Sequence, residues 1–183
     1  MCSLDDDHDT GVPVLRDAVV QLDALRLSDA EAHWAGEDDE HARRFGWYPR
    51  RSTLEGVRAY IVRCEAEWRA GGARRTWAVR PRGTTLLVGG CELRLQADGT
   101  AHISWWVFPA YRRRGIATRA ARLVAGYAFD SLGVRLIEAR VEPDNLASIG
   151  VTRKVGFTEV DEVLDGHTRY ARLVLLPAPM QRT

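Results

Sequence analysis

Lysine is almost absent from this chain, because Lys154 is the single lysine among 26 basic residues. The arginines that take its place scatter along both halves of the sequence, so we attribute them to codon usage and not to a function. Acidic residues number 25, which leaves a formal net charge of +1. Such a balance gives no overall field that would favour nucleic acid or a membrane surface as a partner.

Cysteine is also scarce. Cys2, Cys64 and Cys91 are odd in number and lack the close spacing of a metal site or a redox pair. We expect Cys64 on the apolar face of a helix and Cys91 within a strand, both as reduced thiols of the core. The sequence therefore predicts no metal.

Long hydrophobic runs are missing too. No segment approaches the ~20 apolar residues of a membrane span, and the acidic first residues are not followed by the apolar stretch of a signal peptide. We therefore expect a cytoplasmic protein. With 183 residues, 45% hydrophobic and 28% charged, the composition is that of a globular domain. We expect a flexible tail over residues 1–13 and a single domain over residues 14–183.

The N-terminal half of the domain predicts one strand and two helices. Apolar residues alternate over 20–24, as in a strand with one buried face. Two S-x-x-E patterns, at 28–31 and 52–55, are capping boxes that predict helix starts. Between these helices, residues 37–40 predict an acidic loop.

The remainder of the chain alternates strands with helices, and turn residues such as Gly, Asp and Pro separate the segments. This order predicts an α/β fold with a mixed, mostly antiparallel sheet and helices on both faces. The expected elements are strands at 76–80, 86–95, 101–107 and 136–142, a helix that ends at Gly133, a helix at 145–155 and a hairpin around Asp165-Gly166.

The most informative segment is Arg-Arg-Arg-Gly-Ile-Ala-Thr at residues 112–118. It lies between an apolar strand and an amphipathic helix. At such a helix start, backbone N–H groups have no intrahelical partner and the helix dipole adds partial positive charge. The segment therefore predicts a site for a phosphate or a pyrophosphate.

The R-x-x-G-x-A pattern of residues 112–117 resembles the Q/R-x-x-G-x-G/A signature of the GNAT superfamily, the Gcn-related N-acetyltransferases. About thirty residues later, N-x-x-S at 145–148 and K-x-G-F at 154–157 resemble the stretch that follows the fifth strand of this family. The resemblance covers residues 86–176 and includes the branch of ribosomal-protein, small-amine and aminoglycoside acetyltransferases. It implies a GNAT fold with splayed central strands and acetyl-CoA as the cofactor.

The resemblance also implies where acetyl-CoA binds. In the family the signature loop holds the pyrophosphate, and the splayed strands provide backbone partners for the pantetheine amides, which need such partners when buried. Asn145 matches the asparagine at the far end of that arm. The cofactor-binding residues that we expect are Val107, Phe108, Arg112, Arg113, Arg114, Gly115, Ile116, Ala117, Thr118, Asn145 and Ser148.

Acetyl transfer from a thioester to an amine needs a proton acceptor for the amine and benefits from an acid at the leaving thiolate. Because the thioester is already activated, we expect direct attack within a ternary complex. Thr152 stands where many relatives carry a tyrosine acid, so that mechanism is in doubt here. Ser148 matches a serine proposed to bond the sulfur in similar enzymes, and helix capping is its alternative role.

Three residues are candidates for the catalytic base. Glu92 lies in an otherwise apolar strand, where burial raises the pKa of a carboxyl group. His102 has a reference pKa near ~6.5, and Glu142 ends the strand beside the expected cofactor cleft. Each has a structural alternative: a solvent-facing strand residue, a structural histidine and a member of a charged ladder, respectively.

The acidic loop and its aromatic neighbours predict the acceptor site. Carboxylates beside aromatic faces suit a polycationic molecule with apolar faces, such as an amino sugar. The alternative is a solvated acidic turn beside core aromatics. The substrate-binding residues that we expect are Trp34, Glu37, Asp38, Trp47 and Trp106.

We therefore hypothesise an acetyl-CoA-dependent N-acetyltransferase that acts on a small polar amine, with an aminoglycoside-type antibiotic as the first candidate. A protein N-terminus is the alternative acceptor, as in ribosomal-protein acetyltransferases. A non-catalytic acyl-CoA-binding module is a further alternative, which the threonine at position 152 favours. A nucleic-acid binder is poorly supported, since the three arginines at 112–114 lack interleaved aromatic residues. The sequence is compatible with a monomer or a homodimer.

Overall fold

The structure is a computed structural model that describes residues 11–46 and 52–177. Its sheet is built from β1 (Leu15–Arg16), β2 (Val20–Asp23), β3 (Arg74–Pro81), β4 (Gly89–Leu95), β5 (Thr100–Val107), β6 (Leu136–Val141), β7 (Thr158–Asp165) and β8 (Thr168–Leu175). The helices are α1 (Ala30–Gly36), α2 (Asp39–Arg44), α3 (Leu54–Arg69), α4 (Ile116–Asp130) and α5 (Leu146–Val155), with 3-10 turns at Leu27–Asp29 and Pro109–Tyr111.

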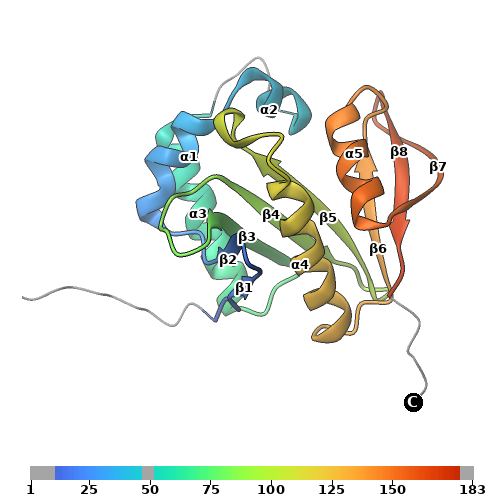
Figure 1. Cartoon of the computed structure of the whole chain (residues 1–183), viewed down its shortest axis with the longest axis horizontal. Coiled ribbons are helices and arrows are strands. Elements are labelled where there is room, and N and C mark those ends of the chain that lie inside the picture. Colours follow the sequence, from blue (N-terminus) through green and yellow to red (C-terminus); the bar gives the residue numbers. More distant parts are fainter. Residues whose placement is uncertain (1–10, 47–51, 178–183) are drawn as a thin grey trace, which may run out of the picture.

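The eight strands form one sheet in the order β1-β2-β3-β4-β5-β6-β8-β7 (Figure 1). All neighbouring strands are antiparallel except β5 and β6, which are parallel. On one face, Val124 and other apolar residues of α4 pack against a cluster that includes Trp77. On the other face, Ile61 of α3 packs with Ala78. The predicted fold class, a mixed and mostly antiparallel sheet with helices on both faces, is confirmed.

Both predicted capping boxes are displaced. The first helical segment begins with the 3-10 turn at Leu27, and Asp29 accepts a hydrogen bond from the amide of Arg26 at 2.8 Å. The prediction that Ser28 is the cap is wrong, since Arg26 is the N-cap of this turn and Asp29, at its third position, bonds the cap amide. α3 begins one residue later than predicted, because Thr53 caps it by accepting a bond from the amide of Gly56 at 3.0 Å.

Half of the predicted acidic loop is helical, because α2 begins at Asp39. Asp38 is the N-cap of α2, since its carboxylate accepts a hydrogen bond from the amide of His41 at 2.8 Å. Acidic residues occupy the first turn and basic residues the last turn, as the helix dipole favours. Two other predicted boundaries are also shifted, because β4 begins at Gly89 and α4 ends at Asp130.

The central strands diverge. Parallel pairing joins only residues 100–102 of β5 to residues 136–138 of β6. β5 then continues to Val107 while paired to β4 alone, and β6 continues to Val141 while paired to β8. The facing edges of the two strands therefore lack a sheet partner beyond His102, which confirms the predicted splay.

The described helices include none that is both long enough and apolar enough to span a membrane. All of them instead lie against the sheet or against one another, and α4, with 15 residues, is nearly as long as α3, with 16 residues.

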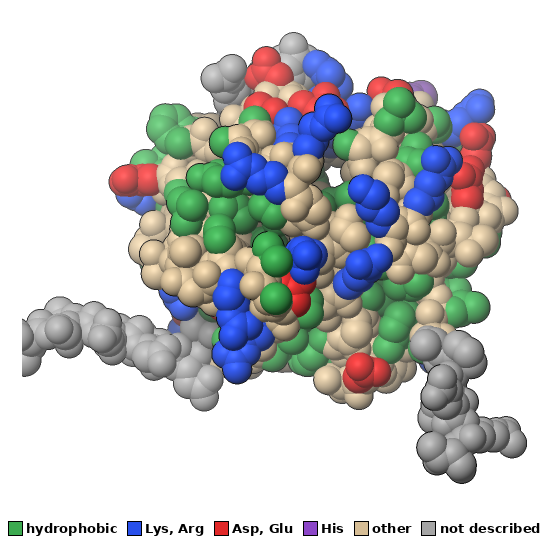
Figure 2. Space-filling view, in the orientation of Figure 1, with side chains coloured by type: hydrophobic (Ala, Val, Ile, Leu, Met, Phe, Trp, Pro, Cys, Tyr) green, Lys and Arg blue, Asp and Glu red, His purple; other side chains and the backbone are tan. Residues whose placement is uncertain are grey.

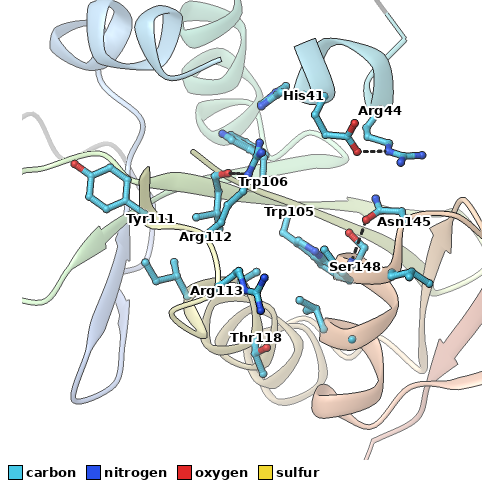
Figure 3. A pocket seen from close by; sticks show the side chains of 18 of the residues that line it. His41, Arg44, Trp105, Trp106, Tyr111, Arg112, Arg113, Thr118, Asn145 and Ser148 are labelled. Atoms are coloured by element: carbon cyan, nitrogen blue, oxygen red, sulfur yellow. Dashed lines mark hydrogen bonds and ion pairs between the residues drawn. The ribbon is translucent and has the colours of Figure 1, made fainter. Parts of the chain in front are cut away.

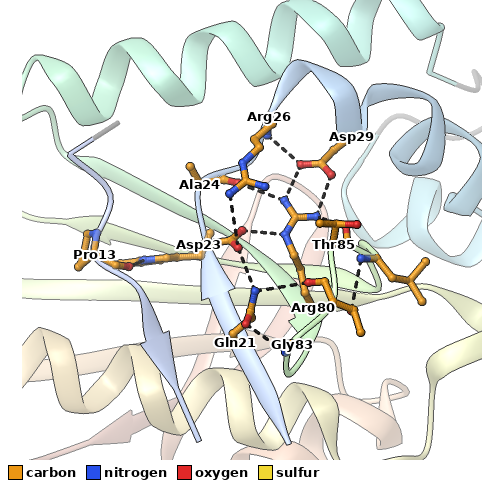
Figure 4. A network of polar contacts seen from close by, with 12 residues as sticks. Pro13, Gln21, Asp23, Ala24, Arg26, Asp29, Arg80, Gly83 and Thr85 are labelled. Carbon is orange, nitrogen blue, oxygen red and sulfur yellow. Dashed lines mark hydrogen bonds and ion pairs between the residues drawn. The ribbon is translucent and has the colours of Figure 1, made fainter. Parts of the chain in front are cut away.

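A buried arginine fixes the start of the domain to the sheet (Figure 4). Arg80 is 1% exposed, and its guanidinium donates to Asp23 at 2.8 Å and to both carboxylate oxygens of Asp29 at 2.8 Å each. It also donates to the carbonyl oxygens of Ala24 and Thr85. A charge taken out of water needs such partners, so this network joins β2, the first 3-10 turn and the segment before β4.

Replacing Arg80 should destabilise the fold strongly. Arg80→Met leaves two buried carboxylates without a cation, which costs on the order of 3–5 kcal/mol. The matched control is Arg82→Met, since Arg82 is exposed in the turn directly after the same strand, and its effect should stay within about 0.5 kcal/mol. Urea unfolding measures both free energies. Equal values for the two variants would contradict the role assigned to Arg80.

Candidate active site

A cavity of about 720 Å³ lies where β5 and β6 diverge (Figure 3). Its walls come from α2, from the end of β5, from the loop before α4, from the first turn of α4 and from α5 as far as Lys154. Most of the expected cofactor-binding residues line it, namely Val107, Arg112, Arg113, Gly115, Ile116, Ala117, Thr118, Asn145 and Ser148. The structure thus brings two distant motifs of the sequence to one cavity.

The N-terminus of α4 opens into this cavity without a side-chain cap. Gly115 is the N-cap in the left-handed region at φ 76°, and its carbonyl accepts the first helical bond from Arg119 at 3.1 Å. The structure gives no hydrogen-bond partner, among the described residues, to the N–H groups of residues 116–118. Free amides at the positive end of a 15-residue helix make an anion site.

The three loop arginines have different roles. Arg112 binds both oxygens of Asp38 at 2.7 and 2.9 Å and donates through Nε to the carbonyl of Val107 at 3.0 Å. Arg113 lines the cavity and has a left-handed backbone at φ 62°, which is uncommon for a residue with a side chain. Arg114 stacks over Tyr111 at 5.7 Å and is not part of the lining. Figure 2 shows Lys and Arg side chains gathered on this face.

At the opposite wall, Asn145 caps α5. Its side-chain oxygen accepts a hydrogen bond from the amide of Ser148 at 3.1 Å, and both residues line the cavity. Asn145 is thus the capping residue, and the alternative that Ser148 is the cap is wrong. The buried Thr152 donates to the carbonyl of Ile149 at 2.8 Å and does not line the cavity.

The two tryptophans of β5 lie on opposite faces of the sheet, and both contribute to the cavity wall. Trp106 is 8% exposed, and its Nε1 has no hydrogen-bond partner among the described residues. Gly90 of the neighbouring strand makes room for it, because a Cβ atom there would lie 2.1 Å from the Trp106 ring. One wall of the cavity is therefore apolar with a single buried donor.

The sequence analysis missed three cavity residues in and directly after α2: His41 and Arg44 of the helix and Phe45 at its C-cap. The His41 and Phe45 rings are 4.8 Å apart between centroids. An acidic N-cap followed by an acidic first turn is a sequence signal for the start of a helix. With a helix starting after Asp38, helical spacing would have placed these three residues on one face.

His41 is buried next to other titratable groups. Burial lowers its pKa from 6.5 to about 4, although the charges of Glu37 and Asp38 act in the opposite direction. His33 and Arg112 lower the pKa further by repulsion. His41 is therefore neutral at neutral pH.

Arg44 connects α2 to the segment after β6. It donates to Glu142 at 2.5 Å, to Asp144 at 2.7 Å and to Glu40 of its own helix at 2.8 Å. Arg44 also lines a second cavity of about 80 Å³ on the β6 side, which it shares with Glu142. This ion-pair cluster crosses the opening between the two diverging strands.

The three expected base candidates are dispersed. Glu92 is 5% exposed and accepts hydrogen bonds from Thr76 at 3.2 Å and Arg94 at 2.6 Å, away from the cavity lining. His102 lies 3.5 Å from Glu138, and burial lowers its pKa. Only Glu142 reaches a cavity wall, and Arg44 neutralises it.

The expected acceptor residues are also dispersed. Trp34 is 47% exposed and donates to the carbonyl of Ser52 at 3.0 Å. Glu37 accepts a hydrogen bond from the Ser52 hydroxyl and lies 3.2 Å from Nδ1 of His33. Asp38 pairs with Arg112, and Trp106 lines the cavity, whereas Trp47 lies outside the described residues. Phe108, expected at the cofactor, instead packs against α1, where a Cβ atom on Gly36 would lie 2.6 Å from its ring.

The pKa of His41 makes protein stability depend on pH. An unfolded histidine binds a proton near pH ~6.5, whereas folded His41 binds one only near a pKa of about 4. Between these values the unfolded state holds the extra proton, so stability is lost as the pH falls. Thermal unfolding of His41→Gln should therefore show a smaller decrease in Tm between about pH 7 and pH 4 than the unmodified protein. Equal decreases would contradict the assigned environment.

Comparisons with known proteins agree with this geometry. The model of the acetyltransferase (GNAT) domain family matches residues 20–158. YoaA of Bacillus subtilis (strain 168), an uncharacterized N-acetyltransferase, is 28% identical over 147 residues, which are 79% of this chain and 82% of YoaA. YjcK of the same organism, named a probable N-acetyltransferase, is 47% identical over 58 residues, and this match spans 32% of either chain.

A solved structure extends the likeness to the whole fold. The ribosomal-protein-S5-alanine acetyltransferase of Vibrio fischeri superposes with a TM-score of 0.77 over 93% of this chain and 100% of that chain, at 16% identity. At this identity the likeness concerns the fold alone. The family model, in contrast, covers the divergent strands, the α4 loop and the α5 motif together. The chain belongs to the GNAT family of acetyl-CoA-dependent N-acetyltransferases.

Proposed function

We propose that this protein transfers the acetyl group of acetyl-CoA to a primary amine of a small acceptor. One observation carries the proposal: a single cavity joins the uncapped N-terminus of α4, the unpaired edge of β5 and an aromatic wall around Trp106. The first feature suits a pyrophosphate, the second suits amide groups and the third suits an organic acceptor. Acetyl-CoA supplies the activated thioester between them.

The part of the cavity that we propose for acetyl-CoA, here called the donor half, uses backbone groups more than side chains. The N–H groups of residues 116–118 are the proposed pyrophosphate ligands, with Arg113 beside them. The edge of β5 from Ile103 to Trp106 offers its backbone to the pantetheine amides, because no described strand pairs with it on that side. The carbonyl of Val107, at the end of this edge, already accepts a hydrogen bond from Arg112. Asn145 lies across the opening from β5 and closes the other side of the channel.

Ser148 is the proposed hydrogen-bond donor to the leaving sulfur. It lines the cavity in the first turn of α5, and Asn145 already performs the capping that would otherwise engage the serine. Thr152 is directed to a helix carbonyl and contributes no acid to the cavity.

The acceptor end favours a small molecule over a peptide. Arg44 crosses the opening to reach Glu142 and Asp144, which limits the room for an extended chain. The aminoglycoside hypothesis depends on Glu37 and Asp38 attracting a polycation, yet both carboxylates already have basic partners. A compact amine with an apolar or aromatic body therefore fits this wall better than a polycation does.

A protein N-terminus is the second candidate acceptor. The fold likeness to the Vibrio fischeri ribosomal-protein-S5-alanine acetyltransferase favours it. A peptide substrate would require the Arg44 cluster to separate from Glu142.

An acceptor panel tests these alternatives. Release of coenzyme A would be followed with phenethylamine, spermidine, kanamycin and a short alanine-initiated peptide, each with acetyl-CoA. We expect the highest kcat/KM for phenethylamine, because the acceptor wall is aromatic and the carboxylate of Asp38 is paired with Arg112. A peptide that exceeds all small amines would favour the second candidate. Binding of acetyl-CoA without turnover of any amine would overturn the proposed function.

Gly115 tests the donor half. No heavy atom outside its immediate chain neighbours lies within 4 Å of a Cβ atom placed there, and both Asp and Asn tolerate its left-handed backbone. Gly115→Asp adds a negative charge beside the proposed pyrophosphate site and should weaken acetyl-CoA binding by about 100-fold, from Coulomb repulsion over a few ångströms.

Gly115→Asn is the matched control, because it has nearly the same shape without the charge. Its Kd for acetyl-CoA, from isothermal titration calorimetry, should stay within about threefold of the unmodified protein if charge is the cause. Equal affinities of the two variants would contradict the pyrophosphate site.

A further inference from the structure

We propose that His41 is the catalytic base that takes the proton from the acceptor amine, and that His33 and Glu37 behind it are positioning residues. The inference deepens the proposed function and rests on it, because a catalytic base is needed only if an amine is acetylated in this cavity.

The position of His41 is the first argument. His41 comes from α2, and both it and Trp106 line the large cavity, with their ring centroids 6.3 Å apart. Ser148, the proposed donor to sulfur, comes from α5 and lines the same cavity (Figure 3). A reacting amine between these walls would have the base on the acceptor side and the leaving sulfur on the other side. Such opposed placement suits removal of a proton from the nucleophile.

The groups behind His41 form a buried polar row. The ring of His33 is 6.5 Å from that of His41 between centroids, and Nδ1 of His33 lies 3.2 Å from Glu37. Glu37 in turn accepts a hydrogen bond from the Ser52 hydroxyl. His33 is 4% exposed, and its Nε2 has no hydrogen-bond partner among the described residues. The unused Trp106 Nε1 belongs to the same ring cluster, at 6.0 Å from His33 between centroids.

Among the described residues, Nε2 of His33 and Nε1 of Trp106 have no hydrogen-bond partner, so both nitrogens are available to a polar group of the acceptor or to water. Buried polar groups are normally hydrogen-bonded, and an exception needs an explanation. A water molecule or the polar group of an acceptor held there would link Trp106, His33 and His41. The row would then hold the imidazole of His41 in one orientation.

The charges around His41 suit a base that accepts a proton and then releases it. Burial keeps the imidazole neutral before reaction, and His33 and Arg112 oppose its protonation. Glu37 and Asp38 face it with negative charge and offset the imidazolium that forms. An ammonium group that enters the same apolar cavity is itself destabilised by burial, which lowers its pKa toward that of the base.

The other candidates are less well placed. Glu92 accepts hydrogen bonds from Thr76 and Arg94, and neither Glu92 nor His102 lines either of the two cavities described above. Glu142 borders the smaller cavity but is held in an ion pair with Arg44.

The step balances without an oxidant or a metal. One proton passes from the ammonium group to His41, and the freed lone pair forms a C–N bond to the carbonyl carbon of the thioester. The C–S bond then breaks, its electron pair leaves on sulfur, and a second proton passes from nitrogen to sulfur beside Ser148. His41 returns its proton to solvent, so the net products are the amide, coenzyme A and one proton.

The test compares His41→Gln and His41→Ala with the matched control His167→Gln, which replaces an exposed histidine of the β7–β8 turn. His102→Gln tests the alternative that His102 is the base. The acceptor is whichever of phenethylamine, spermidine, kanamycin and the alanine-initiated peptide the unmodified protein acetylates fastest. The readouts are kcat across pH, the Kd for acetyl-CoA, and the rate of His41→Ala with added imidazole.

If His41 is the base, His41→Gln should lower kcat near neutral pH by on the order of 100-fold, the scale of general-base catalysis. Its Kd for acetyl-CoA should stay within about threefold, which shows that the fold and the donor half are intact. The deficit should shrink as the pH rises and the amine deprotonates in solution, and imidazole should restore part of the rate of His41→Ala. His167→Gln should match the unmodified protein.

A kcat of His41→Gln close to that of the unmodified protein would overturn the proposal, as would a loss in His102→Gln alone. A loss in the His41 variants that neither pH nor imidazole relieves would show a purely structural role and overturn it as well. Failure of the proposed function looks different, because the unmodified protein would then bind acetyl-CoA and acetylate no amine. In that case the inference falls with it.

Discussion

Beyond His102, none of the described strands pairs with the edge of β5 that faces β6, and the whole site depends on this short parallel pairing. Only three residues of β5 pair with β6 before the strands separate. A fully paired sheet would satisfy the backbone of both strands and leave no channel between them. Because the pairing stops, the edge of β5, the N-terminus of α4 and the N-terminus of α5 can all line the same cavity.

Two ion-pair systems connect α2 to the elements on either side of the cavity. Arg112 joins the loop before α4 to the N-cap of α2, and Arg44 joins the other end of α2 to the segment after β6. α2 has only six residues and would be marginal alone, so these charges and its apolar contacts hold it in place. Since α2 supplies His41, the base that we propose is positioned by the same residues that border the donor loop. Loss of either ion pair would therefore affect both halves of the site.

The residues expected at the cofactor mostly line one cavity, whereas those expected at the acceptor are dispersed, and the reason is physical. The α4 loop and Asn145 act through local backbone geometry, which short patterns encode directly. Trp106, in contrast, depends on Gly90 of the adjacent strand for its space. The partners of Glu37 and Asp38, which are His33 and Arg112, are recognisable only once the chain is folded. Likewise, nothing in the local pattern shows that Arg94 already engages Glu92.

The most direct test of the central claim is an NMR titration of the ¹⁵N-labelled protein with coenzyme A, in which every backbone amide reports separately. Saturable shifts should concentrate at residues 113–118, at Val107 and at the start of α5, while the hairpin of β7 and β8 stays unchanged. Shifts confined to that hairpin, or no saturable shift at the head of α4, would show that the opening between β5 and β6 is not where the donor binds.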